Sequence, residues 1–502
     1  MRRLLLGVIA LASLASVAPA SAQQTGRWVR AESPGFVVFA DTSEARVRDM
    51  IEELESFDSL LRRLTDAPAD HAPRRLEIYA FRGAGPFRHA LPGASETIVG
   101  FYSARLDIVA AYALMRDNYL LDGQDVLFHE YAHHFMYQYF ANFYPAWYVE
   151  GFAEFVSTAD FERDRVVIGR TTPARATWLY QASWLPMERL LTRDLDDGDD
   201  VAKFYAQSWL FTHYLFMTPG KMDQFRAYLR ALQLGGDAIG SFSEAFGITP
   251  AQMQAELRGY LRSRPNALAL NRPPPVEHSA VTVTQLPRSA DSLMGPSTRV
   301  RRLDEDDEAA ADALGDIRRL VGGQPADDFA LMTLARAEGS LGDVGRAREL
   351  LEPRLAANPN DVEALYVIGS ALLRQSRDDG VDDDTRAALL AEARRYFVRA
   401  YRADPNHVPT LYRYVDSFNG EMITEADAEN ILNVLILARQ LAPQVYEINM
   451  RTAELLLSHE RYTEAVPILR VVAYDPHAGA GAEYARQLLA AAEAAMARHG
   501  AH

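Results

Sequence analysis

The sequence predicts an α+β domain followed by an all-α solenoid of helical repeats. Strand-like and helical segments alternate up to about residue 262, which is typical of a sheet with separate helices. From about residue 305 the chain becomes rich in Ala and Leu, and its helical segments come in pairs. Prolines punctuate the stretch between these two parts, which has little periodicity. We therefore assign residues 1–22 to a signal peptide, 23–262 to the α+β domain, 263–304 to a linker or wrapped arm, and 305–502 to the helical repeats.

The first residues have the features of a secretory signal peptide. Arg2 and Arg3 supply the basic end, residues 4–17 form an apolar run, and Ala20-Ser21-Ala22 is a small-residue cleavage motif. No second apolar run of spanning length follows, so we expect no stable membrane span after cleavage. The chain has no Cys, which is compatible with export without disulfides. The sequence therefore predicts a bacterial periplasmic or secreted protein.

The charge of the chain argues against two classes of partner. Its formal net charge is −16 at pH 7. Binding of nucleic acid depends on neutralising phosphates with Lys and Arg, so a nucleic-acid partner is disfavoured. Binding to an anionic membrane surface is disfavoured for the same reason.

A small mixed sheet around one long helix is expected in the first domain. Residues 28–32 and 36–39 have the pattern of a hairpin, because Ser33-Pro34-Gly35 lies between them. Asp41 is expected to open the long helix, with Glu44 completing a capping box. An exposed edge of the sheet could hold an extended peptide by main-chain hydrogen bonds, or the sheet could be scaffold alone. Further strands are expected at residues 76–81, 98–102, 106–112 and 165–168.

The motif that carries chemistry is His129-Glu130-Tyr131-Ala132-His133. On a helix, His129 and His133 are four residues apart, so their imidazoles project from one face about one turn apart. That spacing suits two ligands of one tetrahedral Zn²⁺, with Glu130 beside the open coordination position as general base. His134 points about 100° away around the helix, so we do not expect it to be a ligand.

A second helix, expected to begin at Pro145, supplies two more carboxylates. Glu150 and Glu154 are four residues apart and therefore share one face of this helix. A catalytic zinc takes three protein ligands and a water, and Glu150 is the candidate for the third ligand. Glu154 lies one turn further on, where it could accept the free N–H of a ligand histidine and fix its tautomer.

These residues resemble a known family. The HExxH motif followed by W-x-x-E-G-x-A-E at residues 147–154 resembles the gluzincin metallopeptidases, the thermolysin-like and aminopeptidase-like branch of the zincins. The resemblance implies a zincin-like metallopeptidase domain that holds one catalytic zinc. A looser likeness, from residue 28 to roughly residue 262, is to peptidase-MA-like domains that are often fused to helical repeats. By position, the resemblance gives the ligand roles to His129, His133 and Glu150, and the role of catalytic carboxylate to Glu130.

The same resemblance suggests a donor for the oxyanion. Related domains place a Tyr on a helix downstream of the third ligand, which falls on Tyr205, and His213 is the second candidate. Two departures from the family pattern stand out. The interval from His133 to Glu150 is a little shorter than in the best-known members. The chain also lacks a G-x-M-E-N stretch, which favours an endopeptidase over an aminopeptidase.

In the repeat region, each expected pair of helices ends near a proline. These prolines lie at positions 359, 405, 443 and 476, and the last intervals approach the period of about 34 residues of tetratricopeptide repeats. Ala364, Tyr366 and Gly369 fall where the first helix of such a repeat packs. We expect an α-solenoid of about four tetratricopeptide-like repeats and a C-terminal helix, with an irregular helical bundle as the alternative. Its concave face could bind a peptide or protein partner, or pack on the first domain and restrict access.

Three hypotheses of function remain at this point. The first is an exported zinc metallopeptidase that acts on a peptide or protein substrate. The second is a non-catalytic envelope binding or scaffold protein that acts through its repeats, with a vestigial peptidase domain. The third is zinc-dependent hydrolysis of another bond. The presence of Glu130 together with all three candidate ligands favours the first hypothesis.

Overall fold

The computed structural model describes residues 25–499, except 69, 73, 93–97, 116–122, 141–142, 181–182, 197, 265, 275–279, 304–306, 324–326, 419–423 and 476–479. The predicted signal peptide, residues 1–22, lies outside this part of the chain. Across the described residues, none of the helices combines the length and apolar character needed to cross a membrane.

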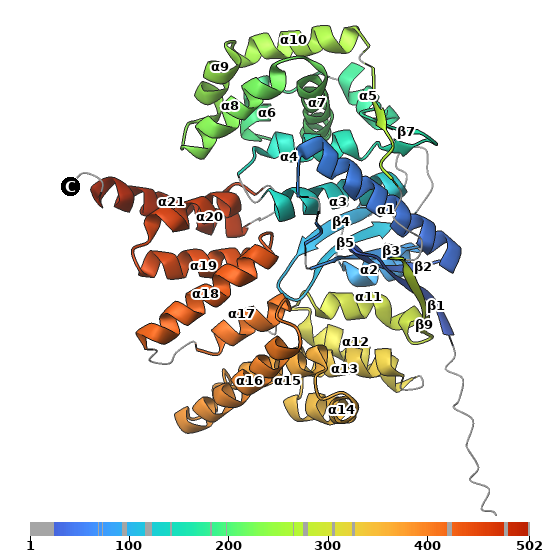
Figure 1. Cartoon of the computed structure of the whole chain (residues 1–502), viewed down its shortest axis with the longest axis vertical. Helices are drawn as coiled ribbons and strands as arrows, with labels where there is room; N and C mark the ends of the chain where they lie inside the picture. The colour runs from blue at the N-terminus through green and yellow to red at the C-terminus, as the bar shows by residue number, and fades with distance from the viewer. Residues whose placement is uncertain are drawn as a thin grey trace, which may run out of the picture.

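A six-stranded mixed sheet forms the centre of the first domain (Figure 1). The predicted hairpin is confirmed, because β1 and β2 pair antiparallel. β2, β3 and β5 run parallel to one another, while β4 pairs antiparallel with β5 and β9 with β1. β4 therefore lies at one edge of this sheet. In spatial order, the strands are β4 (Gly100–Ala104), β5 (Val109–Leu114), β3 (Leu76–Phe81), β2 (Phe36–Asp41), β1 (Thr25–Glu32) and β9 (Thr282–Pro287).

Helices cover both faces of this sheet, and the alternation along β5 shows the two layers. Ala111 and Ala113 belong to the core under α1 (Glu44–Thr65) and α3 (Gly123–Tyr139). Tyr112 and Leu114 belong to the core under α2 (Ala84–Ala90) and α11 (Ala290–Val300). Successive side chains of a strand point to opposite faces, so each strand contributes to both layers.

The start of the long helix differs from the expected one. Ser43, not Asp41, is the N-cap of α1, and its side chain accepts a hydrogen bond from the backbone N–H of Arg46. Asp41 instead ends β2, where it pairs with Trp28. Ladder hydrogen bonds thus extend the strand by two residues beyond the expected end, and the helix begins correspondingly later.

A helical layer packs on the far side of α3. Its first helix is α4 (Ala146–Val156), which begins after Pro145 as predicted and lies between α3 and α7 (Gly198–Met217). A second, three-stranded sheet of β6 (Asp160–Phe161), β7 (Arg165–Ile168) and β8 (Leu268–Asn271) borders this layer. The remaining helices of the layer are α5 (Pro173–Tyr180), α6 (Met187–Thr192), α8 (Lys221–Gln233), α9 (Ala238–Phe246) and α10 (Pro250–Arg262).

The stretch expected to be a linker or wrapped arm, residues 263–304, is an arm that belongs to both sheets. Its residues 268–271 form β8, which pairs antiparallel with β7. Its residues 282–287 form β9, which covers the outer edge of β1. α11 then packs on the sheet beside α2. Each of these contacts satisfies backbone groups or buries apolar surface that a free linker would leave exposed.

From α12 onward the chain consists of helices that pack on their sequence neighbours and stack in one direction (Figure 1). The predicted pairs are present among the described residues, and the predicted C-terminal helix is α21. Gly369 of α15 lies in close contact with the ring of Phe397 of α16, which explains the small residue at that position. The helices are α12 (Ala310–Gly322), α13 (Asp328–Leu341), α14 (Val344–Ala357), α15 (Val362–Gln375), α16 (Asp383–Ala403), α17 (Val408–Asp416), α18 (Glu425–Leu441), α19 (Tyr446–Ser458), α20 (Tyr462–Ala473) and α21 (Ala480–His499).

The helical repeats pack directly on the first domain. Val408, Leu441 and Ile448 belong to the same hydrophobic core as the sheet and α3. At the C-terminal end of α3, the Tyr137 hydroxyl donates a hydrogen bond to Asp475 Oδ1 at 3.0 Å, across 338 residues of sequence. The described part of the repeat region therefore packs on the first domain.

Candidate metal centre

Two helices bring His129, His133 and Glu150 together. The two histidines project from α3 toward α4, which presents Glu150. His129 Nε2 lies 3.1 Å from His133 Nε2. Glu150 Oε2 lies 3.6 Å from His129 Nε2 and 3.5 Å from His133 Nε2. Three ligand-type atoms from residues that the sequence predicts as ligands therefore form a nearly equilateral triangle.

This triangle has the size that a zinc ion requires. Bonds of about 2.0–2.1 Å in tetrahedral geometry place neighbouring ligand atoms about 3.3 Å apart. The observed separations of 3.1, 3.5 and 3.6 Å lie on both sides of that value. The donor set, two imidazoles and one carboxylate, is that of a three-ligand catalytic zinc site. The residues present therefore fit the metal.

Glu154 holds the outer side of His129. Its Oε1 lies 3.2 Å from His129 Nδ1, and its Oε2 accepts a hydrogen bond from Arg175 Nε. Burial raises the pKa of Glu154, but Arg175 and His129 outweigh burial and lower that pKa to about 2. An ionised Glu154 fixes the His129 tautomer with its proton on Nδ1, which leaves Nε2 directed at the other two ligands.

Arg175 was not singled out from the sequence. It lies on α5, 21 residues beyond Glu154, and it is 9% exposed. Neither its spacing from the motif nor its neighbours in the chain marks it as part of the centre. Only the packing of α5 on α7 brings its guanidinium to Glu154.

The ring of His129 is surrounded by negative charge. Burial lowers its pKa, but hydrogen bonds to Glu150 and Glu154, and the charges of Glu154 and Glu130, outweigh burial and raise that pKa to about 10. The side chains around the three ligands therefore favour a cation at this place.

Glu130 and His129 line a cavity of about 630 Å³ that is open to solvent. One wall is the strand edge, where Gly100 of β4 faces α3 so closely that an added Cβ would lie 2.3 Å from Val126 Cγ1. The same Cβ position lies 3.5 Å from Glu130 Oε1, so the candidate base sits beside the sheet edge. The opposite wall comes from α5 and α7, with Trp178 and Tyr205.

Tyr205, the first candidate for the oxyanion donor, lies on the cavity wall near His129. It lines the cavity, and the centroid of its ring is 6.4 Å from that of His129. Burial raises its pKa, and the negative charges of Glu150 and Glu154 raise it further. The phenol therefore keeps its proton and can act as a donor at neutral pH.

The other two histidines considered lie away from the centre. His213, the second candidate for the oxyanion donor, is buried between Phe155 and Trp209, and its Nδ1 lies 2.8 Å from the Tyr260 hydroxyl. It contacts Tyr260 of α10 and is not among the residues that line the cavity. His134 packs beside the sheet, with its Nδ1 3.0 Å from the Tyr102 hydroxyl, and burial lowers its pKa to about 3.

Gly151, which follows Glu150 in the motif, allows α4 to approach α7. A Cβ at this position would lie 2.3 Å from Thr212 Oγ1 and 2.4 Å from the backbone oxygen of Ser208. The two helices could not keep this spacing with any larger residue. Gly151 therefore permits the close spacing of α4 and α7, and this spacing fixes the position of the neighbouring Glu150.

A second cluster of acids and histidine lies behind α3. Glu55, Asp58 and His71 have ligand atoms within 4.8 Å of one another. Arg62 lies among them, donating from Nε to Asp58 Oδ2 at 2.6 Å, so a cation already balances the carboxylate. Tyr131 of α3 donates to Asp58 Oδ1 at 2.6 Å. This cluster therefore joins α3 to α1 and does not suit a metal ion.

Comparisons with known proteins do not assign this chain to a family. No protein-family model matches it, and no curated protein matches it. Among solved structures, the crystal structure of TTC0263, a thermophilic TPR protein of Thermus thermophilus, is 23% identical with a TM-score of 0.31. That match covers 36% of this chain and 90% of TTC0263. A TM-score this low does not establish a shared fold. The assignment of helix pairs in this chain therefore depends only on the contacts between its own helices.

Proposed function

We propose that the chain is an exported zinc-dependent peptidase. The observation that carries the proposal is the triangle of His129 Nε2, His133 Nε2 and Glu150 Oε2, with edges of 3.1–3.6 Å, because His129 also lines an open cavity together with Glu130. A vestigial domain would be expected to lose the base or a ligand, and this chain keeps all four residues.

Each residue has a role that follows from its position. The ion supplies Lewis acidity and lowers the pKa of a water to about 7. Glu130 accepts the proton of the attacking water and passes it to the leaving amine. Tyr205 donates a hydrogen bond to the oxyanion that develops on the carbonyl. Glu154, held by Arg175, accepts the Nδ1 proton of His129 and so orients the ring with Nε2 toward His133 and Glu150.

The substrate class follows from the wall beside Glu130. β4 lies at the edge of the six-stranded sheet, and residues 98–100 line the cavity. An extended peptide can add to such an edge through main-chain hydrogen bonds, which would pass its carbonyl groups across Glu130. We therefore propose peptide bonds as the target. Because the chain lacks the stretch that holds a free N-terminus in the aminopeptidase branch, we propose an endopeptidase.

The test combines metal analysis with one substitution. The chain without its predicted signal peptide is purified gently and assayed for zinc, and it is then incubated with an unfolded protein substrate. We expect about one zinc per chain in both the wild type and Glu130→Gln, because Glu130 is not a ligand. We expect cleavage by the wild type alone. Absence of zinc from the wild type, or equal cleavage by the two proteins, would contradict the proposal.

A further inference from the structure

One tryptophan on the wall of the candidate site has a ring that the protein itself does not engage. The chain has five tryptophans, and all of them lie in its described part. Four of them contact an aromatic or histidine ring or an arginine: Trp28, Trp147, Trp184 and Trp209. Trp178 makes no hydrogen bond, ring contact or cation contact with another described residue. It is half-buried and lines the same cavity as His129 and Glu130.

Small side chains share the cavity wall with this tryptophan. Ala174 lies one turn before Trp178 on α5, so both residues are on one side of that helix. Ala202 and Ala206 lie four residues apart on α7, on the side that also carries Tyr205. α5 packs on α7, and all of these residues line the cavity. Alanine methyl groups leave open the space that larger side chains would fill.

Trp178 lies close to the groups that would react. Arg175, one turn earlier on α5, donates to Glu154, whose other oxygen lies 3.2 Å from His129 Nδ1. One turn of helix spans about 5.4 Å, and consecutive residues of an extended peptide are about 3.3–3.6 Å apart. A peptide with one carbonyl group at Glu130 therefore has its neighbouring side chains within reach of Trp178.

The surroundings of Trp178 favour an uncharged aromatic side chain. The guanidinium of Arg175 lies three residues away on the same helix, so a cationic side chain would be repelled. Arg175 is already paired with Glu154, so it does not require an acidic side chain. An aromatic ring packed against an indole gains more than the burial of its apolar area alone.

We propose that Trp178 forms one wall of a subsite for a phenylalanine or tyrosine side chain of the substrate, within two residues of the cleaved bond. This inference rests on the proposed peptidase function. Ala202 and Ala206 provide the room, and the indole provides the aromatic face. Trp178 determines specificity here and takes no part in moving protons.

The first test measures binding and does not depend on cleavage. The chain with Glu130→Gln, purified with zinc, is titrated with short blocked peptides of glycine and serine that carry one phenylalanine, cyclohexylalanine or lysine. Cyclohexylalanine has the apolar bulk of phenylalanine without its aromatic face. We expect the phenylalanine peptide to bind about 2–10-fold more tightly than the cyclohexylalanine peptide, and the lysine peptide to bind most weakly. Equal Kd values for the first two peptides, or tightest binding of the lysine peptide, would overturn the proposal.

Substitutions in the same Glu130→Gln background locate the subsite. Trp178→Leu keeps an apolar side chain and should reduce the preference for phenylalanine over cyclohexylalanine to about one, whereas Trp178→Phe should keep part of it. Tyr180→Leu, at a residue of the same helix that is 57% exposed, is the matched control and should keep the full preference. If Trp178→Leu does not fold, Ala202→Leu carries the test, because it narrows the subsite and should weaken binding of both bulky peptides. An unchanged preference in Trp178→Leu, or unchanged binding in Ala202→Leu, would overturn the proposal.

Cleavage by the wild type separates this inference from the proposed function. We expect the phenylalanine peptide to be cut within two residues of its aromatic side chain, as read by mass spectrometry, and faster than the cyclohexylalanine peptide. Cleavage at equal rates and at unrelated bonds would overturn the subsite and leave the peptidase. An aromatic preference in binding without any cleavage would overturn the peptidase and leave the subsite.

Discussion

His129 and Glu154 face each other across the outer side of the candidate metal centre, with His129 Nδ1 3.2 Å from Glu154 Oε1. The other carboxylate oxygen of Glu154 is held by Arg175, so the acid is fixed from two sides. His129 consequently has one ring nitrogen committed to Glu154 and the other directed at His133 and Glu150. This relationship makes the orientation of one candidate ligand, His129, depend on Arg175 of α5.

Substitution of Glu154 should therefore weaken metal binding without removing a ligand. We expect Glu154→Gln to lower zinc affinity about 10–100-fold, because an amide is a weaker acceptor and no longer fixes the His129 tautomer. Competition with a chromogenic chelator measures the affinity. Glu162→Gln, at a half-exposed acid beside β6, is the matched control and should bind zinc like the wild type. If both variants bind zinc equally, Glu154 has no orienting role.

Removal of the metal should lower the stability of the folded chain. A ligand present at about 1,000 times its Kd stabilises the state that binds it by about 4 kcal/mol. We expect a chelator to lower the urea midpoint of unfolding in both the wild type and Glu130→Gln. Glu150→Gln, which lacks a ligand, should show a much smaller change on chelation. A chelator effect of equal size in Glu150→Gln would exclude this residue as a ligand.

Gly151 offers a test of how the centre is positioned. We expect Gly151→Ala to destabilise the chain by about 1–3 kcal/mol, because its methyl group would overlap Thr212 and the backbone of Ser208. Zinc affinity should fall too, since α4 also carries Glu150. The matched control is Gly315→Ala in α12, where a Cβ meets open space. This change should stabilise the chain by about 0.5–1 kcal/mol in urea unfolding.

Local spacing was sufficient to predict which side chains meet at the candidate metal centre. Two histidines four residues apart on a helix must share a face, and the same rule places Glu150 and Glu154 together. The contact of Glu154 with His129 follows once the two helices pack. Arg175 and the position of His213 could not be predicted, because both depend on how α5, α7 and α10 pack around α4. Periodicity in a sequence indicates that a face is buried, but not what covers it.

The structure of the arm at residues 263–304 could not be predicted from local sequence either. Its short segments lack the periodicity of independent elements, and they become strands only because β1 and β7 offer open edges. Long-range contacts such as that of Tyr137 with Asp475 leave no local signal either. The order of helices in the repeats was predictable, whereas their docking on α3 and on the β4–β5 turn was not.

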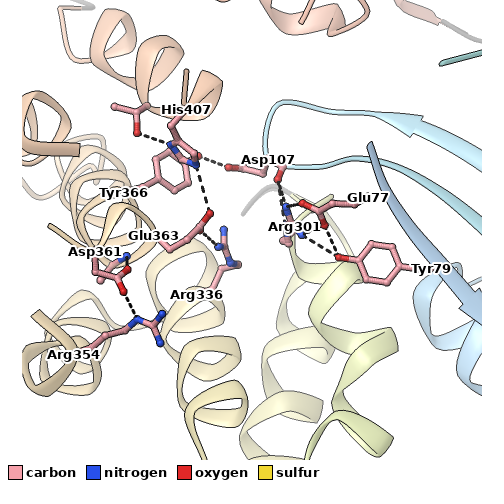
Figure 2. Close-up of polar contacts among 12 residues, drawn as sticks. Glu77, Tyr79, Asp107, Arg301, Arg336, Arg354, Asp361, Glu363, Tyr366 and His407 are labelled. Carbon is pink, nitrogen blue, oxygen red and sulfur yellow. Dashed lines mark hydrogen bonds and ion pairs between the residues drawn. The ribbon is translucent and has the colours of Figure 1, made fainter. Parts of the chain in front are cut away.

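The contact between the sheet and the end of α11 should weaken in acid. Glu77 accepts hydrogen bonds from Arg301 Nη1 at 2.6 Å and Nη2 at 2.8 Å, and from the Tyr79 hydroxyl at 2.6 Å (Figure 2). Burial raises the pKa of Glu77, but Arg301 and Tyr79 outweigh burial and lower that pKa below its ordinary value of 4.5. Glu77 thus stabilises the folded chain at pH values above its unfolded pKa, and the stabilisation is lost as pH falls through the folded pKa.

We therefore expect Glu77→Gln to be less stable than the wild type at pH 7, with a difference that shrinks as the pH is lowered below about 4.5. Urea unfolding of both proteins across this range measures the difference. Glu352→Gln, at an exposed acid of α14, controls for the loss of one charge and should track the wild type throughout. A difference between wild type and Glu77→Gln that stays constant with pH would show that packing, rather than the ionised carboxylate, stabilises this contact.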